Sequence, residues 1–289
     1  MKTTFSEKQL AFVPLLGLWQ LLRPVNVLIG ALSIGIGAWV TGTLSPAKNV
    51  LLACLSGGFI TGAANAINDY FDIEIDLINK PQRPLPARRV SPSGAFSWSI
   101  SLFLLGIGLS FFINTPAIII SGTASLLLFL YSWRFKRLPL IGNITVSFIT
   151  GLAFLYGGVA VGRIQASLIP ATFAFLFHFG REILKDIEDI SGDRAENART
   201  FPICCGVRAA KIVITAVFIL LILATLFPYF KNIYNGLYFA IVLPGVDAYL
   251  LYVIWAFWKS VEPTHLHKLN TGLKADMLVG LLSILVGIH

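Results

Sequence analysis

Hydrophobic residues occur along this chain in long runs that short polar stretches separate. Runs of this length predict helices that cross a bilayer, because about 20 apolar residues are needed to span its hydrocarbon core. We expect nine such helices, near residues 25–44, 49–67, 95–114, 115–133, 139–161, 167–184, 209–228, 236–258 and, more weakly, 273–288. The pattern therefore predicts an all-α, polytopic membrane protein whose nine transmembrane helices surround a central cavity.

The start of the chain differs from these runs. Residues 1–22 combine Lys2, Glu7 and Lys8 with an apolar stretch that Pro14 interrupts, and they lack a small-residue cleavage site. This is not the pattern of a cleavable signal peptide. We expect residues 1–22 to lie along the membrane interface and to lead into one transmembrane domain over residues 23–289.

Composition agrees with a membrane protein and gives its orientation. Hydrophobic residues make up 56% of the chain, charged residues only 12%, and the mean hydropathy is +0.79. Of the 22 Lys and Arg residues, only Lys48, Arg163 and Lys231 fall in loops on the side opposite the N-terminus. Because loops that stay in the cytoplasm collect Lys and Arg, we place the N-terminus and the chemistry on the cytoplasmic side of the cell membrane.

The net charge of +8 does not indicate a nucleic-acid partner, because the basic residues alternate with acids at helix ends instead of forming a separate stripe. Cys54 lies inside an apolar run, and Cys204 and Cys205 are adjacent. This arrangement offers neither a disulfide framework nor zinc-ligand spacing. The expected partners are the lipid bilayer and small lipophilic molecules, and the sequence shows no sign of an obligate protein partner.

Charged and amide side chains gather directly after the second apolar run. Residues 68–86 read NDYFDIEIDLINKPQRPLP, and we call residues 68–76 the first acidic segment. Asn68, Asp72 and Asp76 are spaced four apart, so they would line one face of a helix that continued from the apolar run. Taken alone, this segment also fits a solvated helix end followed by a proline-rich turn.

A second acidic segment changes this interpretation. Residues 186–193 read DIEDISGD and place Asp186, Asp189 and Asp193 on one helical face after another apolar run. Carboxylate and amide oxygens suit Mg²⁺, which usually takes one or two carboxylates together with phosphate oxygens and water. Two facing segments predict two Mg²⁺ ions that hold a diphosphate. Beside long apolar helices, the expected substrates are a prenyl diphosphate and a lipophilic acceptor.

Basic and polar residues accompany both segments. The fourth apolar run ends YSWRFKR, which contains Tyr131 and Lys136, and Asn143 lies just inside the next run. Arg181 and Lys185 precede the second acidic segment, where charge is costly in a membrane unless it is paired or hydrated. We expect all five to bind substrate. The alternative is that the basic residues only anchor the topology, within an aromatic belt at the membrane interface.

A weak internal repeat relates the two segments, because each is followed by an Arg and a Pro, at Arg83-Pro84 and at Arg199 to Pro202. Inverted repeats also occur in ion-coupled transporters, which stay an alternative, as does a membrane scaffold without catalysis. A transporter would place its polar groups near the middle of the bilayer. Here they gather at the cytoplasmic helix ends, which favours an enzyme.

The two acidic segments, with NKPQRP after the first, resemble the aspartate motifs of the UbiA superfamily of intramembrane prenyltransferases. The order of the motifs, their separation of about 110 residues and the nine spans agree over almost the whole chain. The resemblance implies that Mg²⁺ binds Asn68 and Asp72 on one side and Asp189 and Asp193 on the other. It implies that Asp69, Asp76 and Asp186 assist. It also implies that Arg83, Tyr131 and Lys136 contact the pyrophosphate.

Within the superfamily, this form of the first motif is most similar to the branch that makes digeranylgeranylglyceryl phosphate. That branch joins a geranylgeranyl group to geranylgeranylglyceryl phosphate in ether lipid synthesis. Branches that prenylate chlorophyllide or aromatic rings are the alternatives. The sequence departs from the usual pattern at Ala87-Arg88, where a Ser-Gly pair is common. This departure lies outside the ligand positions and affects the choice of branch more than the reaction class.

Overall fold

The computed structural model describes residues 7–195 and 198–288, and every regular element in this part of the chain is helical. In chain order the elements are α1 (Glu7–Leu22), α2 (Pro24–Trp39), α3 (Ala47–Phe71), α4 (Ile73–Asn79), α5 (Pro92–Ser110), α6 (Thr115–Trp133), η1 (Phe135–Arg137), α7 (Ile141–Ala160), α8 (Ile164–Glu188), α9 (Ile190–Ala195), α10 (Phe201–Cys205), α11 (Val207–Phe230), α12 (Gly236–Val242), η2 (Leu243–Asp247), α13 (Ala248–Lys259) and α14 (Pro263–Gly287). The predicted all-α fold is confirmed.

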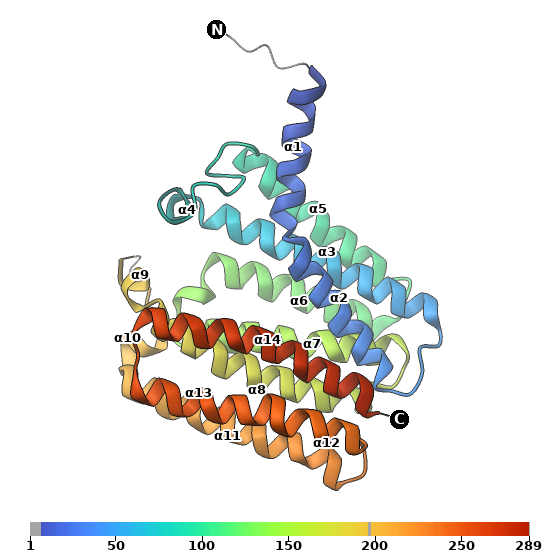
Figure 1. Cartoon of the computed structure of the whole chain (residues 1–289). Coiled ribbons are helices and arrows are strands. Elements are labelled where there is room, and N and C mark those ends of the chain that lie inside the picture. Colours follow the sequence, from blue (N-terminus) through green and yellow to red (C-terminus); the bar gives the residue numbers. More distant parts are fainter. Residues whose placement is uncertain (1–6, 196–197, 289) are drawn as a thin grey trace.

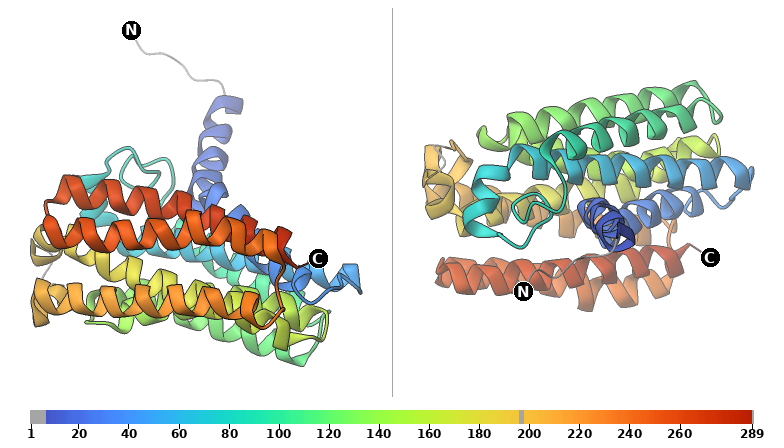
Figure 2. Two further views of the ribbon diagram at one scale, coloured as in Figure 1. Left: turned by 60° about the horizontal axis from the view of Figure 1, so that its bottom comes forward. Right: turned by 90° about the horizontal axis from the view of Figure 1, so that it is seen from above.

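The long helices run side by side in one bundle, and the short α4, α9 and α10 lie together at one end of it (Figure 1). We call this end the polar end. α7 packs against α2, α3, α6 and α8, and α8 in turn contacts α11 and α14. The N-terminal part of α1 projects from the bundle in two views (Figures 1 and 2), while its C-terminal end packs against α3 and buries Leu21. α7 and α8 therefore pack between the N-terminal and C-terminal helices of the bundle, and both acidic segments lie at its polar end.

Seven helices in the described residues are long and apolar enough to cross a membrane, and the bent pair Leu15–Leu22 and Pro24–Trp39 makes an eighth. α12, η2 and α13 count here as one span. The remaining predicted span lies in α8, which has 25 residues and occupies the middle of the bundle but carries charges toward its end. The structure is thus compatible with the nine predicted spans. The bend of 45° separates α1 from the first of them.

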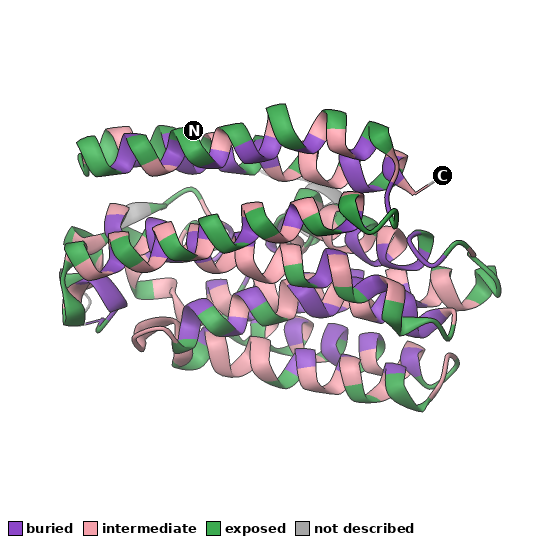
Figure 3. Ribbon diagram, turned by 90° about the horizontal axis from the view of Figure 1, so that it is seen from below, coloured by how far each residue is buried: buried purple, intermediate pink, exposed green. Residues whose placement is uncertain are grey.

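Close backbone contact fixes α2 against α7. A Cβ atom on Gly157 would lie 1.9 Å from the carbonyl oxygen of Ile34, and one on Gly37 would lie 2.1 Å from that of Phe154. Ser167 of α8 donates a hydrogen bond of 2.7 Å to the carbonyl of Gly37 from the other side. Small residues let helices approach in this way in membranes, where packing replaces the hydrophobic effect as the main attraction. Residues on the outer faces of the bundle are widely exposed (Figure 3), and many of these residues are large and apolar.

The sequence predicted that the first acidic segment continues the preceding helix, but the structure shows a break within it. α3 ends at Phe71, and Asp72 adopts φ −101° and ψ 11° before α4 begins. Asp76 is only 3% exposed and accepts a hydrogen bond from Arg83, away from Asp72. The prediction of an uninterrupted helix is therefore wrong at Asp72, and Arg83 from the following loop pairs with Asp76 beyond the break.

Candidate active site

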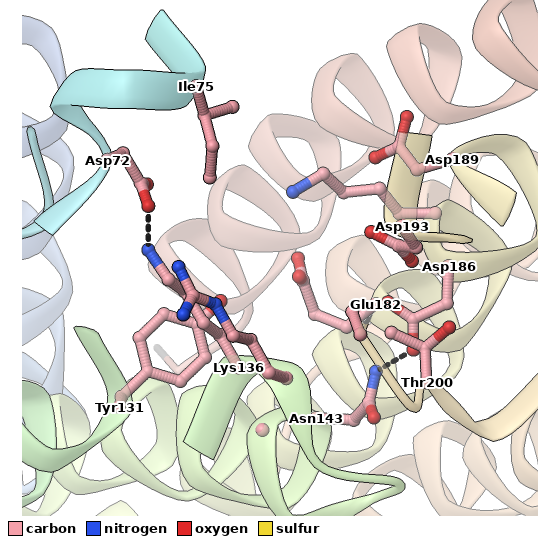
Figure 4. Close-up of a pocket in the computed structure, with 14 residues that line it drawn as sticks. Asp72, Ile75, Tyr131, Lys136, Asn143, Glu182, Asp186, Asp189, Asp193 and Thr200 are labelled. Carbon is pink, nitrogen blue, oxygen red and sulfur yellow. Dashed lines mark hydrogen bonds and ion pairs between the residues drawn. The ribbon is translucent and has the colours of Figure 1, made fainter. Parts of the chain in front are cut away.

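A cavity of about 220 Å³ opens at the polar end of the bundle (Figure 4). Its lining comes from the α3–α4 junction, α6, η1, α7, α8, α9 and the segment before α10. The lining residues are Asp72, Ile75, Tyr131, Lys136, Arg137, Gly142, Asn143, Glu182, Lys185, Asp186, Asp189, Asp193, Ala198 and Thr200. Both acidic segments therefore border the same space, as their expected chemistry requires.

On one wall, Lys136 lies between two oxygens of the first acidic segment. Its ammonium forms an ion pair with Oδ1 of Asp72 and donates a hydrogen bond of 3.2 Å to Oδ1 of Asn68. Nδ2 of Asn68 donates to Oδ2 of Asp72 at 3.0 Å, which fixes the orientation of both side chains. The Lys136 ammonium occupies the position that a metal cation would take, so the Asp72 carboxylate and the Asn68 amide are arranged to hold positive charge.

Next to this wall, but outside the cavity lining, lies a network of ion pairs around two buried carboxylates. Asp69 is 3% exposed and pairs with Arg23 and, at 3.1 Å, with Arg83. Arg83 also pairs with Asp76 at 2.5 Å. Arg23 adopts a left-handed conformation, with φ 50°, at the bend between α1 and α2. Asp69, Asp76 and Arg83 are thus engaged with one another, and Arg23 joins this network through Asp69.

The opposite wall carries the second acidic segment. α8 ends at Glu188 and α9 begins at Ile190, so Asp186, Asp189 and Asp193 reach the cavity from two helices. Nδ2 of Asn143 donates a hydrogen bond of 2.8 Å to Oδ2 of Asp186. Burial raises the pKa of the Asp189 carboxyl, while the nearby Lys185 ammonium opposes this effect. A bound cation would favour the ionised carboxylate in the same way as Lys185.

Basic and hydroxyl groups lie between the two walls. Tyr131 and Lys185, two of the residues expected to bind substrate, line the cavity. Arg181, a third, does not line it and instead pairs with Glu182 at 2.8 Å. Sequence reasoning did not assign three polar lining residues to the site, which are Arg137, Glu182 and Thr200. Thr200 belongs to the RTFP stretch that follows the second acidic segment, and the internal repeat was a signal for it.

Two buried polar atoms of the cavity wall lack a partner among the described residues, Nε of Arg137 and Oγ1 of Thr200. The backbone N–H of Arg199 donates to the carbonyl of Arg137 at 2.9 Å and ties these two regions together. Buried polar groups are nearly always hydrogen-bonded, so two such groups without a partner in a cavity wall indicate that a ligand binds there. Both groups can donate a hydrogen bond, which suits an anion.

The donor set fits Mg²⁺ that arrives with a phosphate ligand. No three His, Cys, Asp or Glu side chains within the described part of the chain form a ready-made metal site. Mg²⁺ does not need one, because it commonly binds one or two carboxylates and completes its octahedron with water and substrate phosphate. Asn68 with Asp72, and Asp189 with Asp193, each supply such a partial set.

Comparisons with known proteins agree with this geometry. The sequence model of the UbiA prenyltransferase family matches residues 27–270. The chain is 40% identical to digeranylgeranylglyceryl phosphate synthase of Methanothermobacter thermautotrophicus, over 80% of this chain and 82% of that protein. It is 37% identical to the synthase of Methanopyrus kandleri, over 93% and 98% respectively.

Solved structures show the same fold. One structure of digeranylgeranylglyceryl phosphate synthase matches with a TM-score of 0.82 and 32% identity, over 95% of this chain and 98% of that chain. A UbiA homologue from Archaeoglobus fulgidus, bound to GPP and Mg²⁺, matches with a TM-score of 0.69 and 20% identity, over 93% and 99%. The family match over most of the sequence, together with the two acidic walls around one cavity, shows that the chain belongs to the UbiA prenyltransferase family.

Proposed function

We propose that this prenyltransferase moves a geranylgeranyl group from geranylgeranyl diphosphate to geranylgeranylglyceryl phosphate, a step of ether lipid synthesis. The observation that carries the proposal is the cavity between two acidic walls, with cationic and hydroxyl groups between them. The choice of acceptor rests on relatives that carry the synthase name at 40% and 37% identity. Lys and Arg at the polar end favour a cavity that faces the cytoplasm.

The metal requirement follows from the donor set. Asn68 and Asp72 would hold one Mg²⁺ ion, and Asp189 and Asp193 would hold a second. When bound, Mg²⁺ neutralises the charge that develops on the diphosphate as its bond to carbon breaks. The Archaeoglobus fulgidus homologue binds GPP with Mg²⁺ on the same fold, which supports this assignment.

The residues of the cavity have separate tasks in this proposal. Lys136 exchanges its contact with Asp72 for a phosphate oxygen, and Tyr131 and Lys185 bind the diphosphate from the α6 and α8 sides. Arg137 and Thr200 donate the hydrogen bonds that no described residue now accepts. Asn143 keeps Asp186 oriented through their hydrogen bond of 2.8 Å.

In the transfer step, the bond between the allylic carbon of the donor and its diphosphate oxygen breaks. The hydroxyl oxygen of the acceptor bonds to that carbon, its proton passes to the departing pyrophosphate, and an ether results. A second cavity of about 60 Å³ lies between α2, α3, α6 and α7, and apolar residues such as Ile60, Leu128 and Leu152 line it. We assign part of the donor's apolar tail to this cavity, because α6 and α7 border both spaces.

The acceptor can be tested directly. Purified protein receives geranylgeranyl diphosphate and Mg²⁺ together with geranylgeranylglyceryl phosphate, 4-hydroxybenzoate, homogentisate or chlorophyllide, each in a separate reaction. Mass spectrometry then identifies any prenylated product. Formation of digeranylgeranylglyceryl phosphate alone is the expected result. Transfer only to an aromatic ring or to chlorophyllide would refute the proposed acceptor and leave the prenyltransferase class intact.

A further inference from the structure

Glu188 is set apart from the other acids of the second acidic segment. Asp186, Asp189 and Asp193 line the cavity, but Glu188 does not. Its Oε1 atom lies 2.8 Å from Nδ1 of His267, and its Oε2 atom accepts a hydrogen bond from Nδ2 of Asn270. Both partners belong to α14. Because both carboxylate oxygens are engaged by another helix, Glu188 is not available as a metal ligand.

These contacts lie at the edge of an apolar interface between α8 and α14. Ile183, Leu184 and Ile187 of α8 belong to the same hydrophobic core as Leu266 and Leu269 of α14. Asn270 follows Leu269 and is only 5% exposed, whereas the side chain of His267 is 72% exposed. The hydrogen bond from Asn270 is therefore the protected one, and the contact with His267 closes the interface toward water.

The contacts of Glu188 with α14 matter because Glu188 lies at the end of α8, directly before the second acidic wall's helix break. Glu188 is the last residue of α8, and Asp189 leaves the helix with φ −94° and ψ 5°. α9, which carries Asp193, has only 6 residues. A helix this short is not stable alone, so tertiary contacts must hold it. The contacts of Glu188 with α14 come directly before this break.

We propose that Glu188 is a positioning residue, which α14 holds through Asn270 and His267 so that Asp189 and Asp193 keep the geometry that metal binding needs. The proposal rests on the proposed function, because it assumes that these two aspartates are ligands. It gives α14, which contributes no residue to the lining of the cavity, a task in positioning the site.

A direct effect of the Glu188 charge on bound metal is the competing explanation, and one substitution separates the two. Glu188→Gln removes the charge but keeps an oxygen that can accept from Asn270 and an N–H that can donate to Nδ1 of His267. Glu188→Ala and Asn270→Ala break the contact from opposite sides. If position is what matters, both alanine variants are defective and the glutamine variant is not.

The test measures metal binding without turnover. Purified full-length protein in detergent is titrated with Mn²⁺ in the presence of inorganic pyrophosphate, and free Mn²⁺ is counted by electron paramagnetic resonance. Loss of an outer partner of a metal site weakens metal affinity about 10- to 100-fold, and we expect the lower part of this range for Glu188→Ala and Asn270→Ala. Glu188→Gln should stay within about twofold of the unaltered protein, by the same reasoning.

Ser167→Ala is the matched control, because it removes an interhelical hydrogen bond of 2.7 Å at the other end of α8. It should leave Mn²⁺ affinity unchanged. The double variant Glu188→Ala with Asn270→Ala should bind Mn²⁺ no more weakly than Glu188→Ala alone, since removal of the Glu188 side chain already breaks its contact with Asn270. Melting curves of all variants show that the protein is folded during the titration.

Unaltered Mn²⁺ affinity in both folded alanine variants would overturn the positioning role and leave the proposed function standing. A loss in Glu188→Gln as large as that in Glu188→Ala would also overturn it, in favour of charge. If the unaltered protein bound no Mn²⁺ with pyrophosphate, the metal site itself would fall, and the proposed function with it.

Discussion

Lys136 is the residue whose contacts best separate a substrate ligand from a topology anchor. It bonds both Asn68 and Asp72 across the cavity wall, whereas Arg134, two residues earlier, is exposed. An anchor tolerates exchange of Lys for Arg, but a point-charge ligand does not, because guanidinium and ammonium differ in shape and hydration. We expect Lys136→Arg to insert and fold normally and to raise the KM for the prenyl diphosphate about tenfold, which corresponds to about 1.4 kcal/mol.

Steady-state kinetics with varied donor concentration measures this effect, and Arg134→Lys is its control. Arg134→Lys should keep the KM and kcat of the unaltered protein. Equal kinetic constants for Lys136→Arg and the unaltered protein would favour an anchoring role for Lys136.

Thr200 makes a second residue-scale prediction, in which stability and binding move in opposite directions. Its buried hydroxyl has no partner within the described part of the structure, and such a group costs about 1–3 kcal/mol. Thr200→Val keeps the shape and removes this cost, so its melting temperature should be equal to or higher than that of the unaltered protein. Substrate affinity should fall, because a hydrogen bond to phosphate is lost. A lower melting temperature with full affinity would show that the hydroxyl is structural.

Much of the candidate site was predictable from spacing alone. The sequence predicted that Asp72, Asp189 and Asp193 would share one space, because acids after apolar runs are costly without a function. It did not predict that Asp69 and Asp76 turn away into ion pairs with Arg83. Spacing says which face of a helix a residue occupies, but the partner of a charge depends on how the following loop folds back.

At the scale of elements, the two acidic segments share a feature that the sequence did not reveal. Each contains a helix break, at Asp72 and at Asp189, so the proposed metal ligands on both walls come from helix ends. The sequence predicted regular helices here because the spacing of the acids would place them on one helical face. Contacts from elsewhere hold these ends, from Arg83 to the first segment and from α14 to the second.

The Arg83 network gives an element-scale prediction about stability. Asp69 and Asp76 are each 3% exposed, and both pair with Arg83. Removing one partner of a buried ion pair typically costs about 3–5 kcal/mol, because a charge stays buried without compensation. Arg83→Ala should therefore lower the melting temperature clearly, while Arg208→Ala, at an exposed position of the polar end, should not.

Thermal unfolding in detergent, without substrate, checks this expectation. A variant Arg83→Ala that melts like the unaltered protein yet loses donor affinity would assign Arg83 to the pyrophosphate instead of to the α3–α4 junction.

For the whole molecule, hydropathy alone predicted the helical class and most spans, because apolar runs in a bilayer have few other structures available. α8 is the informative exception. It lies among apolar helices but carries the charges of the site, so it is less apolar than its neighbours. The role of α14 was missed, since single polar residues such as Asn270 do not show from sequence which helix they contact.

Orientation is the prediction that belongs to the whole molecule. Cys204 and Cys205 are exposed in α10 at the polar end, while Cys54 is half-buried in α3. If the polar end faces the cytoplasm, a membrane-impermeant thiol reagent should label the Cys204 and Cys205 pair in inside-out vesicles and leave it unlabelled in right-side-out cells. Mass spectrometry of the labelled peptide reads the result, and labelling from outside intact cells would reverse the assigned orientation.

In the proposed function, catalysis depends on metal held between the two acidic walls. The most direct test measures the rate of prenyl transfer in variants that alter one wall at a time. Asp72→Asn and Asp193→Asn each remove one carboxylate from opposite walls of the same cavity. We expect each folded variant to lose at least about 100-fold in kcat, the loss typical when one stabilising group for developing charge is removed. Excess chelator should abolish turnover of the unaltered protein, and added Mg²⁺ should restore it. Full turnover in either variant, or in chelator, would contradict the two-wall mechanism.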